Sequence, residues 1–252
     1  MNLVILVLDS FTPNSIRNSK TQKKTWVKEA SKHSEVLFYK GSTSTKRENF
    51  DLILNCSDTY QDMGLKTLKA FEWVDENLNY DYIFRTNTSS YVYYENLIKY
   101  LKKIKDKEVN YCGYVGKYQD LHYVSGSGII LSKSSIQKIL NTRKKFNNKL
   151  VEDIAIGELL KFNSILPTEG TRQDIESHDD ILNIDSNQYH IRCRVDSFGY
   201  SRELERYILK YLFKKTKMYG VFLVFVMKMN QYYLIRKNNL KTFIKIKLNL
   251  IK

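Results

Sequence analysis

The sequence predicts an α/β fold in which helices cover both faces of a mostly parallel sheet. Short apolar runs rich in β-branched residues alternate with amphipathic helical segments through about residue 160, which is the pattern of repeated strand–helix–strand units. Of the 252 residues, 42% are hydrophobic and 13% aromatic, enough to build a large core. The length predicts one large domain, or one domain with an appendage.

The first third of the chain supplies three of the predicted strands and two of the predicted helices. Short apolar runs bounded by polar residues predict strands at residues 2–8, 35–39 and 50–54. Large apolar residues at three- and four-residue steps predict helices at residues 20–31 and about 60–78. Between the first strand and the first helix, Pro13 and Asn14 predict a loop over residues 11–18.

The middle of the chain continues the alternation. The same reasoning predicts strands at residues 80–85, near 110–116 and at 121–131, and helices at residues 96–105, near 133–143 and near 151–161. Ligands of such sheets bind outside the carboxyl ends of the strands. Polar residues that directly follow a strand are therefore the first candidates for a site, and here they are Ser10, residues 85–90 and residues 125–128.

The net charge of +14 is concentrated at the end of the chain. All 27 acidic residues lie at or before Glu205, so residues 1–205 carry a net charge of +2 and residues 206–252 carry +12. The charge predicts a division into a domain at 1–205 and a basic amphipathic segment at 206–252. Nucleic-acid binding is disfavoured, because the body is nearly neutral and the basic segment lacks a recognisable DNA- or RNA-binding pattern.

The basic segment predicts contact with an anionic membrane surface, because large apolar residues lie between its Lys and Arg residues. The alternative is that 206–252 packs on the domain as helices with a solvated charged face. The longest uncharged apolar run there, Met218 to Met227, is too short to span a bilayer. Three widely spaced cysteines and no visible targeting segment predict a cytoplasmic protein, with peripheral membrane attachment as a further expectation.

Four segments, in the same order along the chain, resemble the inverting β-1,3-glycosyltransferases of the galactosyltransferase and Fringe type (family 31). They are Leu6 to Trp26, Asp51 to Trp73, YVSGSGIILS at 123–132 and VEDIAIG at 151–157. The resemblance implies a GT-A-like Rossmann-type sandwich. It also implies transfer of a sugar from a nucleotide donor, a UDP-sugar, to a hydroxyl of a carbohydrate or glycoconjugate acceptor.

The chain departs from this family after the central strand. Family members carry three consecutive Asp residues there, which hold a divalent metal on the nucleotide diphosphate, whereas this chain has Asn87, Thr88 and Ser89. One expectation is a weak Mn²⁺ or Mg²⁺ held largely by the substrate phosphates. The other is a metal-free site in which Arg85, Arg192 or Arg194 neutralises the diphosphate. A third alternative is a catalytically impaired protein that binds without turnover.

His190 stands where the family often has a metal-binding histidine, so the resemblance makes it a candidate metal ligand. The alternation in residues 188–194 also predicts that His190 shares a strand face with Arg192 and Arg194. Three basic groups on one face suit a diphosphate or a metal–diphosphate. The competing interpretation is an exposed face of an edge strand.

Asp153 is the leading catalytic candidate. An inverting transfer needs one carboxylate to take the proton of the acceptor hydroxyl, and Asp153 stands in the predicted first turn of a helix, where the dipole favours the ionised form. Glu152 is predicted to support it or to contact the acceptor. The predicted donor-binding residues are Ser10, Arg17, Lys66, Arg85, Asn87, Ser89, Ser125, Gly126 and Arg192. Arg17 and Lys66 can equally be surface charges, and Ser125–Gly126 can be a turn or bulge.

Overall fold

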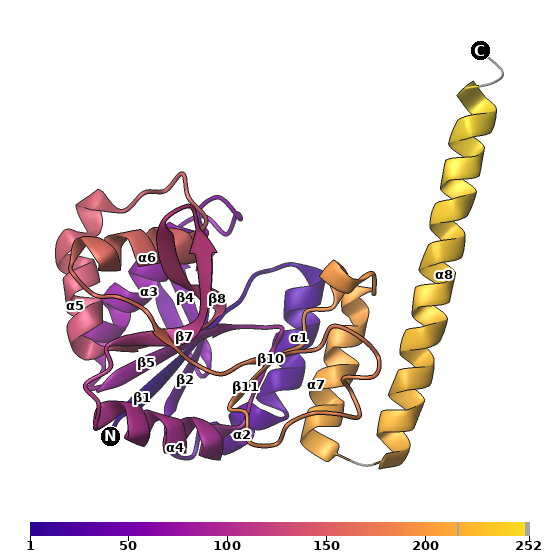
Figure 1. Ribbon diagram of the computed structural model, residues 1–252. Helices are drawn as coiled ribbons and strands as arrows, with labels where there is room; N and C mark the ends of the chain where they lie inside the picture. The colour runs from indigo at the N-terminus through magenta and orange to yellow at the C-terminus, as the bar shows by residue number, and fades with distance from the viewer. Residues whose placement is uncertain (216, 250–252) are drawn as a thin grey trace.

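A computed structural model describes residues 1–215 and 217–249 and has a central sheet of eight strands (Figure 1). In spatial order these are β3 (Lys46–Glu48), β4 (Asp51–Asn55), β2 (Glu35–Ser42), β1 (Leu3–Leu8), β5 (Tyr82–Asn87), β8 (Leu121–Ser132), β7 (Tyr111–Tyr118) and β9 (Thr168–Glu169). The four strands β4, β2, β1 and β5 are parallel, while β8 runs antiparallel to both of its neighbours. The predicted parallel sheet is thus its centre, and the edges are mixed.

Helices cover both faces of the sheet, as the alternating pattern predicts. The helices are α1 (Pro13–Lys23), α2 (Trp26–Ala30), α3 (Met63–Asn77), α4 (Tyr94–Lys105), α5 (Lys133–Thr142), α6 (Glu152–Phe162), α7 (Glu205–Lys214) and α8 (Lys217–Asn249). Alternate residues of β1 face opposite sides: Val4 and Leu6 pack with α3, α5 and α6, whereas Ile5 and Val7 pack with α2, α4 and α7. The predicted strands and helices are confirmed to within a few residues, except that the helix predicted at residues 20–31 is the end of α1 followed by the separate short helix α2.

The predicted loop at residues 11–18 is wrong. Helix α1 begins at Pro13, which occupies its first position, where proline fits because that backbone nitrogen needs no helical partner. The helix hides polar residues such as Asn18 and Gln22 rather than an apolar stripe. It therefore lacks the hydrophobic periodicity by which amphipathic helices are detected in a sequence.

A second, three-stranded sheet lies beside the first and joins distant parts of the chain. Its strands are β10 (Gln173–Asp174), β11 (His190–Arg192) and β6 (Ser90–Val92). Strand β11 runs antiparallel to β6 with Arg192 opposite Ser90, and the Cys193 N–H donates to the Ser89 carbonyl at 2.7 Å. The residues after 189 are therefore held directly against the turn that follows β5.

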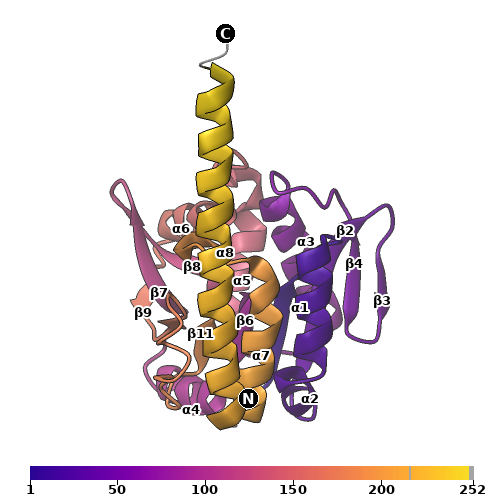
Figure 2. The ribbon, with the colours of Figure 1, turned by 90° about the vertical axis from the view of Figure 1, so that its right-hand side faces the viewer.

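The basic segment begins inside the body of the protein. Ile208, Leu209 and Leu212 of α7 are buried in the same core as β1, so they are not available to a membrane. The following helix, α8, buries Leu223 and Met227 against the body and then extends past it (Figures 1 and 2). No helix in the described residues is long and apolar enough to span a membrane. The boundary at residue 205 stays a prediction, but α7 does not lie free.

Candidate active site

A cavity of about 410 Å³ lies where the carboxyl ends of β1 and β5 meet β8 and the start of α6. Ten of the residues predicted from the sequence line it, namely Ser10, Lys66, Arg85, Asn87, Ser89, Ser125, Gly126, Glu152, Asp153 and Arg192. Two predicted residues, Arg17 and His190, are not in its lining. The candidates that the rule about strand ends selected, Ser10, residues 85–90 and residues 125–128, all contribute to this lining.

Asp153 lies in the first turn of α6 and is half-buried in the cavity wall. Its Oδ2 accepts the Gly126 N–H at 2.8 Å, and its Oδ1 accepts the Ile154 N–H at 3.0 Å. A Cβ at Gly126 would lie only 3.3 Å from Asp153 Oδ2, so the glycine permits the close approach of β8 to the carboxylate. Two backbone N–H groups thus orient the Asp153 carboxylate at the start of α6.

Glu152 has its oxygens committed to protein partners. It forms a buried ion pair with Arg85 and accepts a hydrogen bond from the Thr67 hydroxyl. Burial raises the pKa of Glu152, and the Arg85 guanidinium opposes that rise. Arg85 also donates from Nε to the Tyr39 hydroxyl at 3.0 Å and is 2% exposed. This pair braces β5 against α6 and places Asp153; it leaves Arg85 little freedom to neutralise a ligand.

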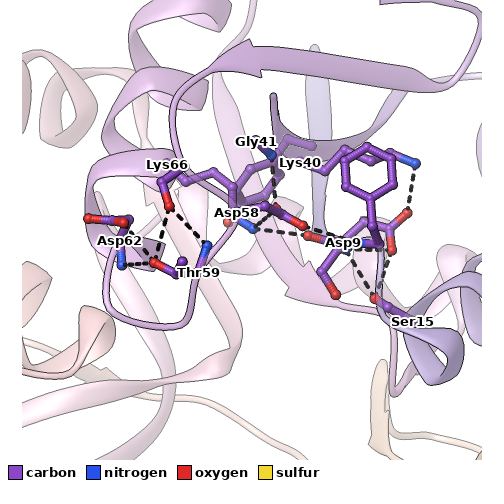
Figure 3. A network of polar contacts seen from close by, with 12 residues as sticks. Asp9, Ser15, Lys40, Gly41, Asp58, Thr59, Asp62 and Lys66 are labelled. Atoms are coloured by element: carbon purple, nitrogen blue, oxygen red, sulfur yellow. Dashed lines mark hydrogen bonds and ion pairs between the residues drawn. The ribbon is translucent and has the colours of Figure 1, made fainter. Parts of the chain in front are cut away.

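Lys66 is likewise engaged within the protein, in the network drawn in Figure 3. Its Nζ donates to Asp58 Oδ1 at 2.7 Å and to the Asp9 carbonyl at 3.1 Å. Asp58 also accepts the backbone N–H groups of Gly41 and Phe11, at 2.9 and 3.1 Å. Lys66 therefore connects the loop after β1 to the loop after β4. Because these two contacts occupy most of its ammonium group, it has little hydrogen-bonding capacity left for a nucleotide.

Asp9 is a site residue that sequence reasoning did not select, although it directly follows β1. It is 1% exposed and lines the cavity. Its Oδ1 accepts from the Ser15 hydroxyl at 2.7 Å, while its Oδ2 lies 3.4 Å from Lys40 Nζ (Figure 3). In the described part of the chain Oδ2 has no hydrogen-bond partner. That oxygen is enclosed and faces Lys40, so Asp9 shapes this end of the cavity through its contacts with Ser15 and Lys40.

The turn that replaces the family's three Asp residues satisfies its own polar groups. Asn87 Oδ1 accepts from the Ser89 N–H and from the hydroxyls of Ser89 and Ser90, at 3.0 to 3.1 Å. The Thr88 hydroxyl lies 3.1 Å from that of Ser15. These neutral, mutually bonded oxygens offer a divalent cation a far weaker site than carboxylates would. Across the described residues, no group of three His, Cys, Asp or Glu side chains is placed to hold a metal ion.

His190 is a buried neutral side chain, contrary to the predicted metal or diphosphate contact. It is 1% exposed, its Nε2 lies 3.0 Å from the Ser90 hydroxyl, and its ring packs against Gly128. Burial, with the charges of Arg172 and Arg192, lowers the pKa of His190 to about 3. The imidazole therefore fastens β11 to β6. The same strand nevertheless carries Arg192 to the cavity, and Arg194 follows it there.

Arg17 is the second predicted residue outside the cavity lining. Its Nη2 contacts Asn14 Oδ1 and lies 3.5 Å from Glu203, so it links α1 to the segment before α7. Arg202, which the sequence did not single out, does line the cavity. An ion pair with Glu205 positions the Arg202 side chain at the cavity, with Arg202 Nε 2.8 Å from Glu205 Oε1. Glu205 is itself anchored by Asn18 at 2.6 Å, a pairing that spacing alone does not reveal.

A sheet with helices on both faces and a cavity at the strand ends is the arrangement of the GT-A-like fold. The chain superimposes on the crystal structure of a glycosyltransferase involved in the glycosylation of the major capsid of PBCV-1 with a TM-score of 0.50 and 11% identity. The match covers 83% of this chain and 99% of that one. At this identity the likeness concerns the fold, and it confirms the predicted fold class.

Within that class the chain resembles the β-1,3-glycosyltransferases of the galactosyltransferase type, as its motifs predict. The Galactosyltransferase family model matches residues 20–121. Human UDP-GalNAc:beta-1,3-N-acetylgalactosaminyltransferase 1 is 31% identical over 137 residues, covering 44% of this chain and 41% of the human protein. The rat enzyme of the same name is 28% identical over 211 residues, covering 66% of this chain and 62% of its own length. The chain thus spans less than two thirds of the length of each of these relatives.

Proposed function

We propose that this protein is an inverting glycosyltransferase that moves a sugar from a UDP-sugar to a hydroxyl of a carbohydrate or glycoconjugate, with Asp153 as the general base. The observation that carries the proposal is the position of Asp153. It is a half-buried carboxylate at a helix start, on the wall of a polar cavity at the strand ends. The family resemblance and the relatives named for UDP-GalNAc support a UDP-linked donor.

The chemistry follows from that placement. The acceptor oxygen attacks the anomeric carbon while its proton passes to Asp153, and the bond from that carbon to the diphosphate oxygen breaks on the opposite side. Both electrons of the broken bond leave with the nucleoside diphosphate, so the anomeric configuration inverts in one step. Asp153 needs no change of role during the reaction, since a single carboxylate accepts the single proton.

The nucleoside end of the donor is expected near the end of β1. There the cavity is lined by Asp9, Ser10 and Thr12. The hydroxyls of Ser10 and Thr12 can donate to or accept from a ribose hydroxyl or the base. The diphosphate would then extend along the turn at Asn87 toward Ser125 and Ser127, whose hydroxyls also line the cavity.

The test is a screen of UDP-sugars for slow hydrolysis, followed by transfer to soluble acceptors. Asp153→Asn should lower the transfer rate by roughly 10² to 10⁴-fold while UDP binding stays near wild type. Glu158→Gln is the matched control, because Glu158 is an exposed acid on the same helix. Wild-type transfer by Asp153→Asn would remove Asp153 from the mechanism. UDP binding without hydrolysis of any donor would favour the impaired, binding-only alternative.

We also propose that the protein attaches to an anionic membrane surface through α8. Helix α7 is not assigned to this contact, because its Ile208, Leu209 and Leu212 side chains are buried in the core. Large apolar side chains that are 52% to 84% exposed recur at four- and three-residue steps on this helix, namely Met218, Phe222, Phe225, Met229 and Tyr232. Such a stripe on a basic helix is typical of segments that lie in a membrane interface. Attraction of its Lys and Arg residues to anionic lipid headgroups would add to that binding.

The test is co-sedimentation with anionic vesicles. Binding should weaken as salt rises and should be absent with neutral vesicles. The triple variant Phe222→Ser, Phe225→Ser, Tyr232→Ser should lose it, whereas Phe162→Ser with Leu166→Ser, two exposed apolar residues of the body, should not. Removal of residues 206–252 is a poor substitute, because it would strip the buried side chains of α7 from the core. Equal binding by the triple variant would refute this attachment.

A further inference from the structure

The arrangement around the cavity does not fit the divalent metal that the family resemblance implies. Asn87 and His190 stand at the expected ligand positions, but Asn87 Oδ1 accepts from Ser89 and Ser90, and His190 Nε2 is bonded to the Ser90 hydroxyl in a buried site. The acids of the cavity are engaged as well: Asp9 faces Lys40, Asp58 pairs with Lys66, Glu152 pairs with Arg85, and Asp153 accepts the Gly126 N–H.

We infer that guanidinium groups, led by Arg192, take the place of the metal and hold the diphosphate of the donor. The inference rests on the proposed function, since it assigns the diphosphate subsite of that same cavity. Arg192 and Arg194 line the cavity together with the turn at Asn87 to Ser89. Backbone pairing fixes that proximity, because Arg192 lies opposite Ser90 and the Cys193 N–H bonds to the Ser89 carbonyl at 2.7 Å.

Arg192 has a weaker ion pair than Arg172 or Arg194, so more of its positive charge is available to a ligand. Asp174 is held by Arg172 through two contacts of 2.6 and 2.9 Å. Arg192 reaches the same carboxylate at only 3.4 Å. One carboxylate therefore serves two guanidinium groups, so this trio retains one positive charge. Arg192 is 24% exposed and has most of its five N–H donors available.

Arg194 and Arg202 extend the same wall with partly compensated charge. Arg194 pairs with Asp196 at 2.8 and 3.1 Å, and Arg202 pairs with Glu205 at 2.8 and 3.2 Å. Each pair uses one edge of the guanidinium, and the acids fix the position of the remaining donors. Such preset cations neutralise a leaving diphosphate without any rearrangement of the site.

Arg172 has a supporting position in this arrangement. Its Nη1 donates to the hydroxyls of Ser125 and Ser127 at 2.9 and 2.8 Å. Both serines line the cavity, whereas Arg172 is absent from the lining and its side chain is 6% exposed. Arg172 is thus a positioning residue: it orients two cavity hydroxyls and occupies Asp174, which leaves Arg192 free for an anion.

The experiment compares the binding of UDP and of uridine by calorimetry, in EDTA and with Mn²⁺. The wild-type protein should bind UDP in EDTA, with little gain from Mn²⁺. Arg192→Gln should weaken UDP binding roughly 10- to 100-fold, as expected for loss of charge-assisted hydrogen bonds, and should leave uridine binding unchanged. Arg192→Lys should fall between the two. Arg143→Gln, a surface arginine 54% exposed beside Glu72, is the control and should behave as wild type.

Three possible results distinguish failure of this inference from failure of the proposed function. UDP binding that is lost in EDTA and restored by micromolar Mn²⁺ would overturn the inference while leaving the proposed function standing. Equal weakening of UDP and uridine binding by Arg192→Gln would also overturn it, because that variant would then have damaged the cavity. The thermal unfolding midpoint of Arg192→Gln, and the same UDP and uridine comparison with Arg194→Gln, distinguish such damage from the loss of a phosphate contact. Failure of the wild-type protein to bind UDP or uridine at all would refute the proposed function itself, and the inference with it.

Discussion

Buried His190 makes the stability of this protein depend on pH in a defined window. The native imidazole is enclosed by Ser90, by Gly128 and by Phe84, whose ring centroid lies 5.8 Å away. Burial is the main reason that its pKa falls from the usual 6.5 to about 3. The unfolded chain binds a proton near pH 6.5, whereas the native protein does so only near pH 3. Stability from this group is therefore complete above pH 6.5 and is lost as the pH falls toward 3.

The magnitude follows from the difference between the two pKa values. Each pH unit inside the window changes the free energy of unfolding by about 1.4 kcal/mol. Between pH 7.5 and pH 5 the loss attributable to His190 is therefore about 2 kcal/mol. Other groups also titrate in this range, so the measured quantity is the difference between wild type and a His190→Gln variant at the two pH values. Glutamine keeps a polar group within reach of Ser90 and does not titrate.

Urea denaturation at pH 7.5 and pH 5 provides the measurement. His190→Gln should be less stable at pH 7.5, but its further loss on acidification should be about 2 kcal/mol smaller than that of wild type. His122→Gln, which removes an exposed histidine, should lose as much as wild type. Identical pH dependence in wild type and His190→Gln would show that the native imidazole titrates normally, and the account of His190 as a neutral buried group would be wrong.

Three further predictions concern packing around the site. Glu152→Ala should lower the free energy of unfolding by about 3 to 5 kcal/mol, because it leaves the Arg85 charge buried without its partner; a loss below about 1 kcal/mol would contradict the buried pair. Leu212→Ala should cost about 2 to 5 kcal/mol in urea denaturation, and unchanged stability would mean that α7 is not part of the core. Gly128→Ala would place a Cβ 2.5 Å from His190 Nδ1, and overpacking of this kind costs about 1 to 3 kcal/mol; a thermal midpoint equal to wild type would refute the tight packing there.

The sequence was informative wherever one physical rule acts locally. Apolar runs located the buried strands of the sheet, and the rule about strand ends selected Ser10, Asn87 and Ser125, which line one cavity. Asp153 lines it too, and was selected by the family resemblance and its place in the first turn of a helix. The same approach failed for α1, because that helix buries polar side chains and shows little amphipathic pattern. A proline at the first helical position is the signal that could have found it.

The roles of charged residues depended on partners that spacing does not reveal. Lys66 was expected at the nucleotide, yet it is neutralised by Asp58. Arg85 was expected at the diphosphate, yet it faces Glu152, 67 positions away. Whether an arginine is free for a ligand is set by such long-range pairs. For the same reason Arg202 was missed, since only the folded contacts between Glu205 and Asn18 explain its place on the cavity wall.

Three arginines of the cavity wall, Arg192, Arg194 and Arg202, come late in the chain, and this order has a consequence for biosynthesis. The eight-stranded sheet has all its strands by Glu169, whereas Arg192, Arg194 and Arg202 follow later in the sequence. A polypeptide emerging from the ribosome is therefore expected to gain its sheet before it gains the cationic wall of the cavity. Incomplete chains that end before Arg192 would have the strands and Asp153, but neither the three arginines nor the α7 part of the core. Such chains should therefore bind the nucleotide poorly, because both its cationic contacts and part of the support of the sheet are missing.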